Sequence, residues 1–238
     1  MRQFALGFAA CITLVSCLSW AAVANLDVER FAGSVLVRVN DLPVRAGSGK
    51  PASVVRDAGT AFDRIVLRSA ENLDVRIGPE ASITLHGDDN LLELIETRID
   101  GGRLMIESRG SYRSKTPLRV EVQLPSLRAF ALEGSADARI RGVTGKALEI
   151  ELNGSGNITA SGSVENLDVD LNGSGDASLG GLKAVRVEAD LNGSGDITVA
   201  ASEALEAELN GSGDIRYHGS PARLRMEVNG SGDIERAD

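Results

Sequence analysis

The chain has 238 residues, of which only 3% are aromatic and 27 are glycine, and its formal net charge is −9 at pH 7. This composition excludes a large core built around aromatic rings, so small and aliphatic side chains must do the packing. Residues 148–238 hold 17 acidic and six basic side chains. Because phosphate recognition needs the opposite charge, nucleic acid and anionic membranes are excluded as partners of this region.

The first 24 residues have the pattern of a signal peptide. Arg2 precedes an apolar run over 4–18, and "AVA" at 22–24 places small residues at the cleavage positions. The alternative is a lipoprotein signal, because "LVSC" at 14–17 would make Cys17 the lipidated first residue. The apolar "LSWAAVA" that follows Cys17 favours cleavage after Ala24 instead.

Both cysteines of the chain, Cys11 and Cys17, lie inside this segment. Cleavage after Ala24 therefore removes them, and the mature protein has no disulfide. We expect an exported protein of the periplasm or cell envelope. Anchoring through a lipid on Cys17 is the less favoured outcome.

Residues 25–59 are predicted to be an N-terminal extension and linker. They contain one strand-like run, "SVLVRV" at 34–39, and "RAGSGKPAS" at 45–53, which has the composition of a flexible connector. From residue 60 onward, short alternating runs broken by Gly, Pro, Asp and Asn predict strands with one buried face. Within this region only "NLLELIETRI" at 90–99 could form a short helix.

A repeat dominates residues 127–238. The motif N-G-S-G-(D/N) occurs five times, with its asparagines 18 to 20 residues apart, and each copy follows an alternating strand such as "LDVDL" at 167–171. One such unit cannot bury its apolar face alone, whereas stacked units can, at about 4.8 Å per layer. The pattern predicts an all-β parallel solenoid whose coils each bury three or four positions. Asn-Gly also favours hairpins, so an antiparallel sandwich or prism is the alternative fold.

Stacked turns would place equivalent side chains in columns. The side-chain amides of the first column can donate to one another as a structural ladder, and its members are Asn153, Asn172, Asn192, Asn210 and Asn229. A second column contains Asn157 and four carboxylates, namely Asp176, Asp196, Asp214 and Asp233. Carboxylates stacked this closely could bind calcium, although the period and the Gly-to-Asp spacing differ from those of calcium β-rolls. The other interpretation is that these carboxylates are solvated or bonded to the backbone. We therefore expect no metal or other cofactor.

Acidic residues also alternate along the outward side of the repeated strands, at positions 149, 151, 168, 170, 188, 190, 206, 208 and 227. A charged face that keeps the sheet soluble is the simpler interpretation. The alternative is a docking surface for a cationic partner or a hydroxyl-rich glycan.

Catalytic signatures are weak. The two histidines, His86 and His218, are far apart in the sequence, and no nucleophile elbow or phosphate loop occurs. Arg216, Arg223 and Asp214 could serve an acidic-polysaccharide lyase, but surface charge explains them equally well. We expect a protein that is not an enzyme.

Several stretches together resemble one known family. They are "FDRIVLRSAENLDVRIGPEASITLHGDDNLLELIETRIDGGRLMIES", "VEVQLPSLRAFALEGSADARIRG" and the repeats that end in "GDIRYHGSP". They are similar to the putative autotransporter adhesin head GIN domain family, over a domain spanning 60–238. The resemblance implies an exported bacterial protein with a right-handed parallel β-helix-like fold, and it carries over no catalytic or binding residue.

The function expected from this resemblance is that of a non-enzymatic adhesin-like or scaffold protein. A periplasmic glycan-binding or glycan-active β-helix is the alternative. The charges of "ERAD" at 235–238 would discourage end-to-end stacking of the last coil, which predicts a monomer or a weak end-to-end dimer.

Overall fold

The computed structural model describes residues 26–31, 34–39, 44–59 and 61–237, so the predicted signal peptide and Cys17 lie outside the described residues. The chain divides into two units, residues 1–44 and 45–238. In the first unit β1 (Leu26–Phe31) and β2 (Ser34–Val39) form an antiparallel hairpin. The strand predicted over 34–39 is present, and the sequence analysis missed its partner.

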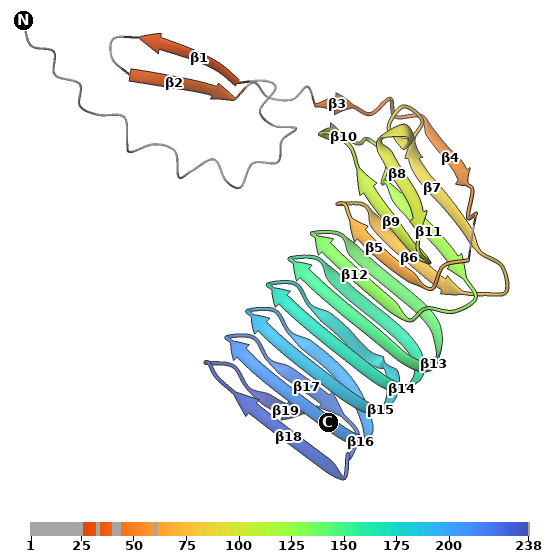
Figure 1. The fold of residues 1–238 in the computed structure, drawn as a ribbon, viewed down its shortest axis with the longest axis vertical. Coiled ribbons are helices and arrows are strands. Elements are labelled where there is room, and N and C mark those ends of the chain that lie inside the picture. The colour runs from red at the N-terminus through yellow and green to blue at the C-terminus, as the bar shows by residue number, and fades with distance from the viewer. Residues whose placement is uncertain (1–25, 32–33, 40–43, 60, 238) are drawn as a thin grey trace, which may run out of the picture. The chain divides into compact units, whose positions relative to one another are not determined.

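The second unit is a β-solenoid, as the repeat spacing predicted (Figure 1). Its regular part consists of four long strands, each bent around one coil: β13 (Asp137–Gly154), β14 (Asn157–Gly173), β15 (Ala177–Gly193) and β16 (Ile197–Gly211). All pairings between these coils are parallel, and they align each motif asparagine with the next. The antiparallel sandwich or prism is therefore wrong for the repeats.

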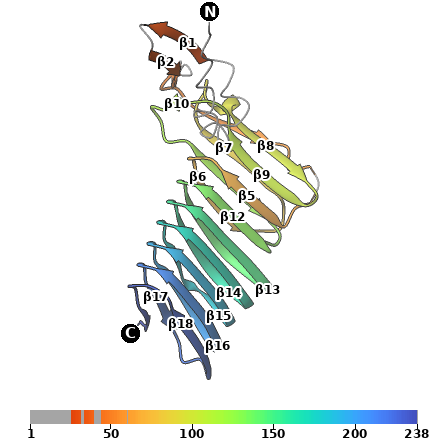
Figure 2. The same cartoon turned by 60° about the vertical axis from the view of Figure 1, so that its left-hand side comes forward.

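Because each long strand bends around its coil, the stacked coils form two faces, which we call the two sheets. Less regular strands precede the repeats and continue both sheets (Figures 1 and 2). The strands that pair in parallel with this stack are β5 (Arg64–Arg68), β6 (Asn72–Ile77), β9 (Arg103–Ser108), β11 (Arg119–Leu124) and β12 (Ala129–Gly134). Antiparallel strands close this end of both sheets, namely β4 (Pro51–Arg56), β7 (Ser82–Asp88) and β8 (Ile95–Asp100). A small parallel pair is formed by β3 (Arg45–Ala46) and β10 (Tyr112–Arg113).

The last coil consists of three short strands. β17 (Ile215–His218) and β18 (Arg223–Val228) both pair with β16, and β19 (Ile234–Arg236) pairs with β17. β18 therefore forms the end of one sheet and β19 the end of the other.

The core is a continuous stack of aliphatic side chains. Each regular coil buries six or seven positions, more than the three or four expected, and in β14 these are Ile158, Ala160, Val164, Leu167, Val169 and Leu171. The additional positions include corners such as Val164, where the strand bends and simple alternation breaks down. Because each coil is thin, a buried Leu or Ile contacts the copies above and below it, and contributes about 1.5–3 kcal/mol.

Two local predictions differ from the structure. The stretch 45–53, predicted to be a connector, contains β3 and the start of β4 and packs as part of the second unit. Residues 90–99 contain a 3₁₀ turn, η2 (Leu92–Leu94), followed by β8, because the buried Ile95 begins an alternating strand that pairs with β9.

Candidate functional site

The N-G-S-G-D turns are explained by how closely successive coils approach. The backbone N–H of Ser194 donates to the carbonyl of Gly173 at 2.9 Å, and that of Ser212 to the carbonyl of Gly193 at 2.8 Å. A Cβ atom on Gly195 would lie 1.8 Å from the carbonyl oxygen of Gly175. Glycine is therefore required there for space alone, since any side chain would collide with the backbone of the coil before it.

The aspartate column also joins one coil to the next. The N–H of Asp196 donates to Oδ1 of Asp176 at 3.0 Å, that of Asp214 to Oδ1 of Asp196 at 2.9 Å, and that of Asp233 to Oδ1 of Asp214 at 3.0 Å. Arg216 donates from Nη2 to Oδ2 of Asp214 at 2.7 Å. Within the described residues no group of three or more potential ligands is placed to hold a metal ion. The geometry is that of backbone-bonded aspartates.

The asparagine column stacks in register, but its described hydrogen bonds stay within one coil. Asn210 Nδ2 donates to Glu208 Oε1 at 2.8 Å, and Asn229 Nδ2 to Glu227 Oε1 at 3.3 Å. Asn153 bonds Glu151 in the same way at 2.5 Å. These three amides thus donate hydrogen bonds to carboxylates of the adjacent row instead of bonding to one another.

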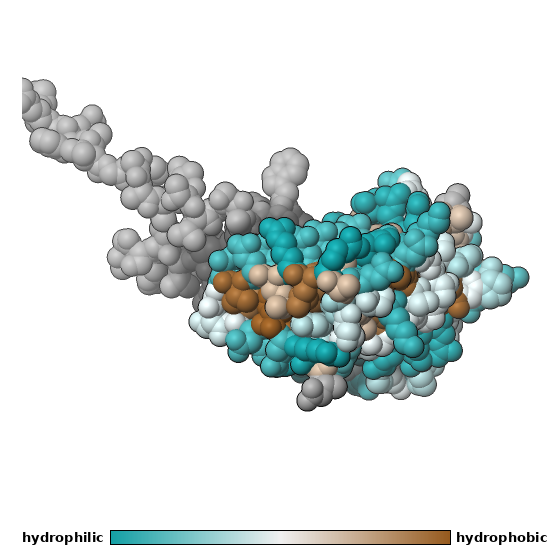
Figure 3. All heavy atoms as spheres, turned by 90° about the horizontal axis from the view of Figure 1, so that it is seen from below, coloured by the Kyte–Doolittle hydropathy of each residue, from teal (hydrophilic) through white to brown (hydrophobic). Residues whose placement is uncertain are grey.

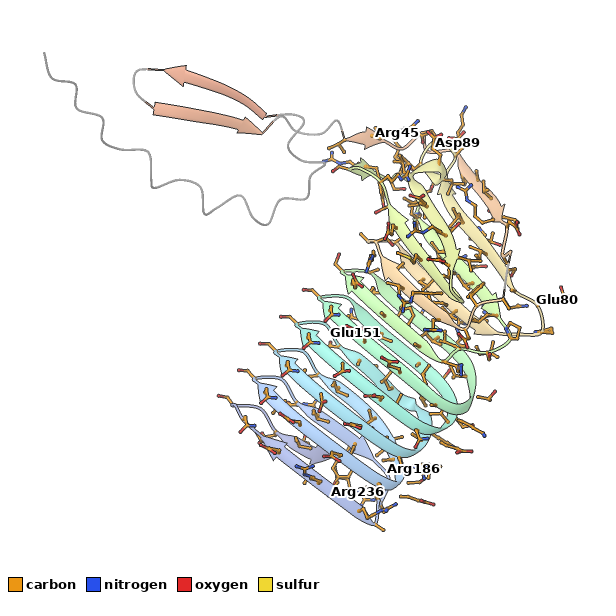
Figure 4. The ribbon with its side chains drawn as sticks, viewed as in Figure 1. Arg45, Glu80, Asp89, Glu151, Arg186 and Arg236 are labelled. Atoms are coloured by element: carbon orange, nitrogen blue, oxygen red, sulfur yellow. The ribbon has the colours of Figure 1, made fainter. Side chains whose placement is uncertain are left out.

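The outward acidic residues form two parallel rows on one sheet, which we call the acidic face. One row contains Glu149, Asp168, Glu188 and Glu206, and the other contains Glu151, Asp170, Asp190, Glu208 and Glu227. Neighbours within a row are one strand spacing apart, about 4.8 Å. Figure 4 labels Glu151 and shows that equivalent side chains recur from coil to coil.

Electrostatic repulsion across this face is largely uncompensated. Burial and the surrounding carboxylates, with Asp170 and Glu208 foremost among them, raise the pKa of Asp190. The pKa values of Asp168 and Asp170 are raised for the same two reasons. Within the described part of the chain, the one ion pair of this face joins Arg225 to Glu206. A bound cation or hydrogen-bond donor would therefore relieve strain already present in the folded protein.

A groove of about 740 Å³ runs along the edge of the acidic face. One side consists of the first acidic row, and the other carries Arg128, Arg186 and Arg223, with Asn166 between them. Arg186 donates from Nε to Oδ1 of Asn166 at 2.7 Å. The groove thus offers guanidinium and amide donors beside carboxylate acceptors, which is the mixture that binds hydroxyl-rich ligands.

Sequence reasoning missed two polar arrangements. Asp88 is fully buried in β7 and accepts hydrogen bonds from Gly49, Ser114, Lys115 and Thr116. Burial alone would raise its pKa, but these donors outweigh burial and lower the pKa to about 2. The group anchors the segment after β3 and the segment after β10 to β7. Its partners are 26 to 39 residues away, so no local motif reveals it.

The second polar arrangement that sequence reasoning missed is a row of side chains across β4, β7 and β11. Ser53 Oγ lies 2.8 Å from His86 Nδ1, and His86 Nε2 lies 3.5 Å from Glu121 Oε2. Ser53 is exposed, and Arg119 pairs with Glu121, 2.7 Å from Nη2 to Oε1. Among the described side-chain contacts of this row, no hydrogen-bond donor is directed at the Ser53 hydroxyl apart from the His86 ring.

The three residues considered for lyase chemistry are divided between the two sheets. Arg216 and Asp214 form an ion pair near β17, whereas Arg223 begins β18 and lines the groove. Histidines 86 and 218 are also on different strands, β7 and β17.

Together these features define a class: an all-β solenoid whose repeated coils present the same side chains in rows. Within the described residues no helix has the length and apolar character needed to cross a membrane. The chain belongs to the family described as "Putative auto-transporter adhesin, head GIN domain", which matches residues 61–221.

Solved structures share this fold. A putative adhesin from Bacteroides fragilis NCTC 9343 is 22% identical, with a TM-score of 0.67, over 81% of this chain and 99% of that one. Two proteins of Parabacteroides distasonis ATCC 8503 cover the same shares: a putative lipid binding protein (21% identical, TM-score 0.56) and a putative adhesin (20%, 0.53). At this identity the likeness shows the fold alone. No curated protein matches the chain.

Proposed function

We propose that the protein is an exported, non-enzymatic, adhesin-like module of the cell envelope, whose acidic face is its binding surface. The observation that carries this proposal is the repetition of the same two carboxylate rows, in register, across successive coils. A polymeric partner can contact such rows at many equal steps, so that weak individual contacts add up to firm retention. Membership of the adhesin family supports the same function.

Location decides whether adhesion to an external target is feasible. Intact producing cells would be treated with protease, and the released peptides and the mature N-terminus would be identified by mass spectrometry. We expect repeat peptides to be released before the envelope is opened and the mature chain to begin after Ala24. Release only from opened cells would contradict an adhesive function, and a lipid on Cys17 would contradict the predicted cleavage.

The groove supports a second candidate, a periplasmic glycan-binding protein. The test is retention on purified insoluble peptidoglycan, comparing the wild type with a triple variant of the acidic row that lines the groove, Asp168→Asn, Glu188→Gln and Glu206→Gln. The matched control removes three exposed carboxylates elsewhere, through Glu80→Gln, Glu165→Gln and Glu203→Gln, with the same change in net charge. Loss of retention in the first variant alone would favour this function. Equal retention by all three proteins would exclude the carboxylates of the groove as the glycan-binding groups.

A further inference from the structure

The two ends of the solenoid are finished differently. At the N-terminal end, antiparallel strands and η2 cover the core, and Leu91, Leu92 and Ile95 are at most 2% exposed. At the C-terminal end, three apolar side chains of β18 are open to solvent, with Leu224 and Met226 each 44% exposed and Val228 46%.

This exposure arises because no described residue forms a layer beyond β18, and not from a change of sequence pattern. β18 alternates as the earlier coils do, and its apolar residues stack on Leu205, Ala207 and Leu209 of β16, which are at most 2% exposed. Figure 3 looks onto this end and shows an apolar patch between hydrophilic margins. The free edge of β18 also presents backbone donors and acceptors that nothing among the described residues pairs with.

The other sheet ends in a strand that resists pairing. β19 has only three residues, and Arg236 occupies the position that stacks on the buried Tyr217. A charge at an inward-facing position discourages a further strand. The charge of Arg236 would therefore discourage pairing at the edge of β19, whereas β18 has no charge at an inward position.

We propose that two copies of the chain join tail to tail, each adding its β18 to the other's sheet as an antiparallel neighbour centred on Met226. Antiparallel pairing about a two-fold axis keeps apolar side chains facing the core only if the paired residue numbers differ by an even number. With Met226 opposite its own copy, Leu224 faces Val228 of the partner, so all three exposed apolar side chains are covered.

Charge selects this register over its neighbours. Centring on Met226 places Arg225 opposite the partner's Glu227 twice, once on each side of the axis. A shift of one residue toward the N-terminus sets Arg225 against its own copy, and a shift toward the C-terminus sets Glu227 against its own copy. Like charges directly opposite each other oppose pairing, whereas opposite charges favour it.

The same register supplies a cation to the second acidic row. Glu227 extends that row beyond Glu208, and its described hydrogen bond comes from the amide of Asn229. Arg225 of the partner subunit would follow Glu227 as the next side chain in the row. Within one chain Arg225 already pairs with Glu206 of the first acidic row. In the dimer, Arg225 of the partner subunit would pair with Glu227 of the second row in the same way.

The test is sedimentation equilibrium of the purified protein over a range of concentrations. We expect the wild type to shift from monomer to dimer as concentration rises. Met226→Lys places two like charges at the axis and should weaken the dimer by more than about a hundredfold. Val55→Lys, a change at another exposed valine on β4, is the matched control and should leave the dimer intact. Circular dichroism melts would confirm that each variant is folded.

A charge exchange tests the register itself. Arg225→Glu and Glu227→Arg should each weaken the dimer, and the double variant should restore it, because the cross-axis pairs are re-formed with reversed sign. Three results would overturn the proposal: a wild type that is monomeric at every soluble concentration, a Met226→Lys variant that dimerises like the wild type, or a double variant weaker than both single ones. If the wild type were monomeric at every soluble concentration, the edge of β18 would instead be expected to pair with a strand of another protein.

Discussion

Replacing Gly195 with alanine tests whether the repeated turn exists for coil-to-coil contact. The new Cβ would lie 1.8 Å from the Gly175 oxygen, so the two turns must separate. Separation breaks the hydrogen bonds made by the N–H groups of Ser194 and Asp196, which are 2.9 and 3.0 Å long. At about 0.5–1.5 kcal/mol for each bond, with disturbed packing added, the free energy of unfolding should fall by roughly 2–4 kcal/mol.

The assay is urea unfolding followed by far-ultraviolet circular dichroism. Gly181→Ala is the matched control, because its nearest contact would be 3.3 Å, to the Ala160 oxygen in the preceding coil, and its φ is not in the left-handed region. We expect that variant to lie within about 1 kcal/mol of the wild type. Equal losses for the two variants would refute the steric explanation of the turn.

Four further predictions concern charge and packing. Asp190→Asn should raise the melting temperature at neutral pH by the equivalent of ~0.5 kcal/mol, because it removes like-charge contacts that are partly screened by solvent. Folding raises the pKa values of Asp168, Asp170 and Asp190, so the folded wild type binds more protons than the unfolded chain. Its melting temperature should therefore rise as pH falls from neutrality toward about 4. If the melting temperature did not rise, the repulsion between these carboxylates would be contradicted. Asp88, whose pKa is lowered to about 2, should have the opposite effect, with stability lost as pH falls from about 4 through 2, and Asp88→Asn should flatten that acid limb in melts taken across pH. Leu191→Ala, at a fully buried position, should cost about 2–5 kcal/mol in urea unfolding, whereas a loss below about 1 kcal/mol would show that the stacked core is loosely packed.

The repeat made the solenoid predictable. A spacing of 18 to 20 residues between identical turns can bury alternating Leu and Val only by stacking, and the parallel register of the asparagines follows from that. The carboxylate rows were also readable from the alternation along strands such as "LDVDL". What the spacing could not show was the partner of each polar atom.

The missed features depend on contacts between distant segments. Gly47 looked like part of a flexible connector, yet a Cβ there would lie 2.0 Å from Oδ2 of Asp88, so this glycine serves close packing. Val164, at a corner of its coil, is buried although no alternation marks it. The amide of Asn210 bonds a carboxylate of its own coil, a choice that depends on side-chain geometry rather than residue type.

Near-identical coils raise a problem during folding that the finished structure conceals. Since β14, β15 and β16 present almost the same surface, a growing stack could skip one coil and lose little contact energy. The irregular N-terminal layers have no such ambiguity, because the hydrogen bonds of Asp88 and the antiparallel strands fit only one arrangement. We expect these layers to form first and to act as the template from which correct coil order propagates toward the C-terminus.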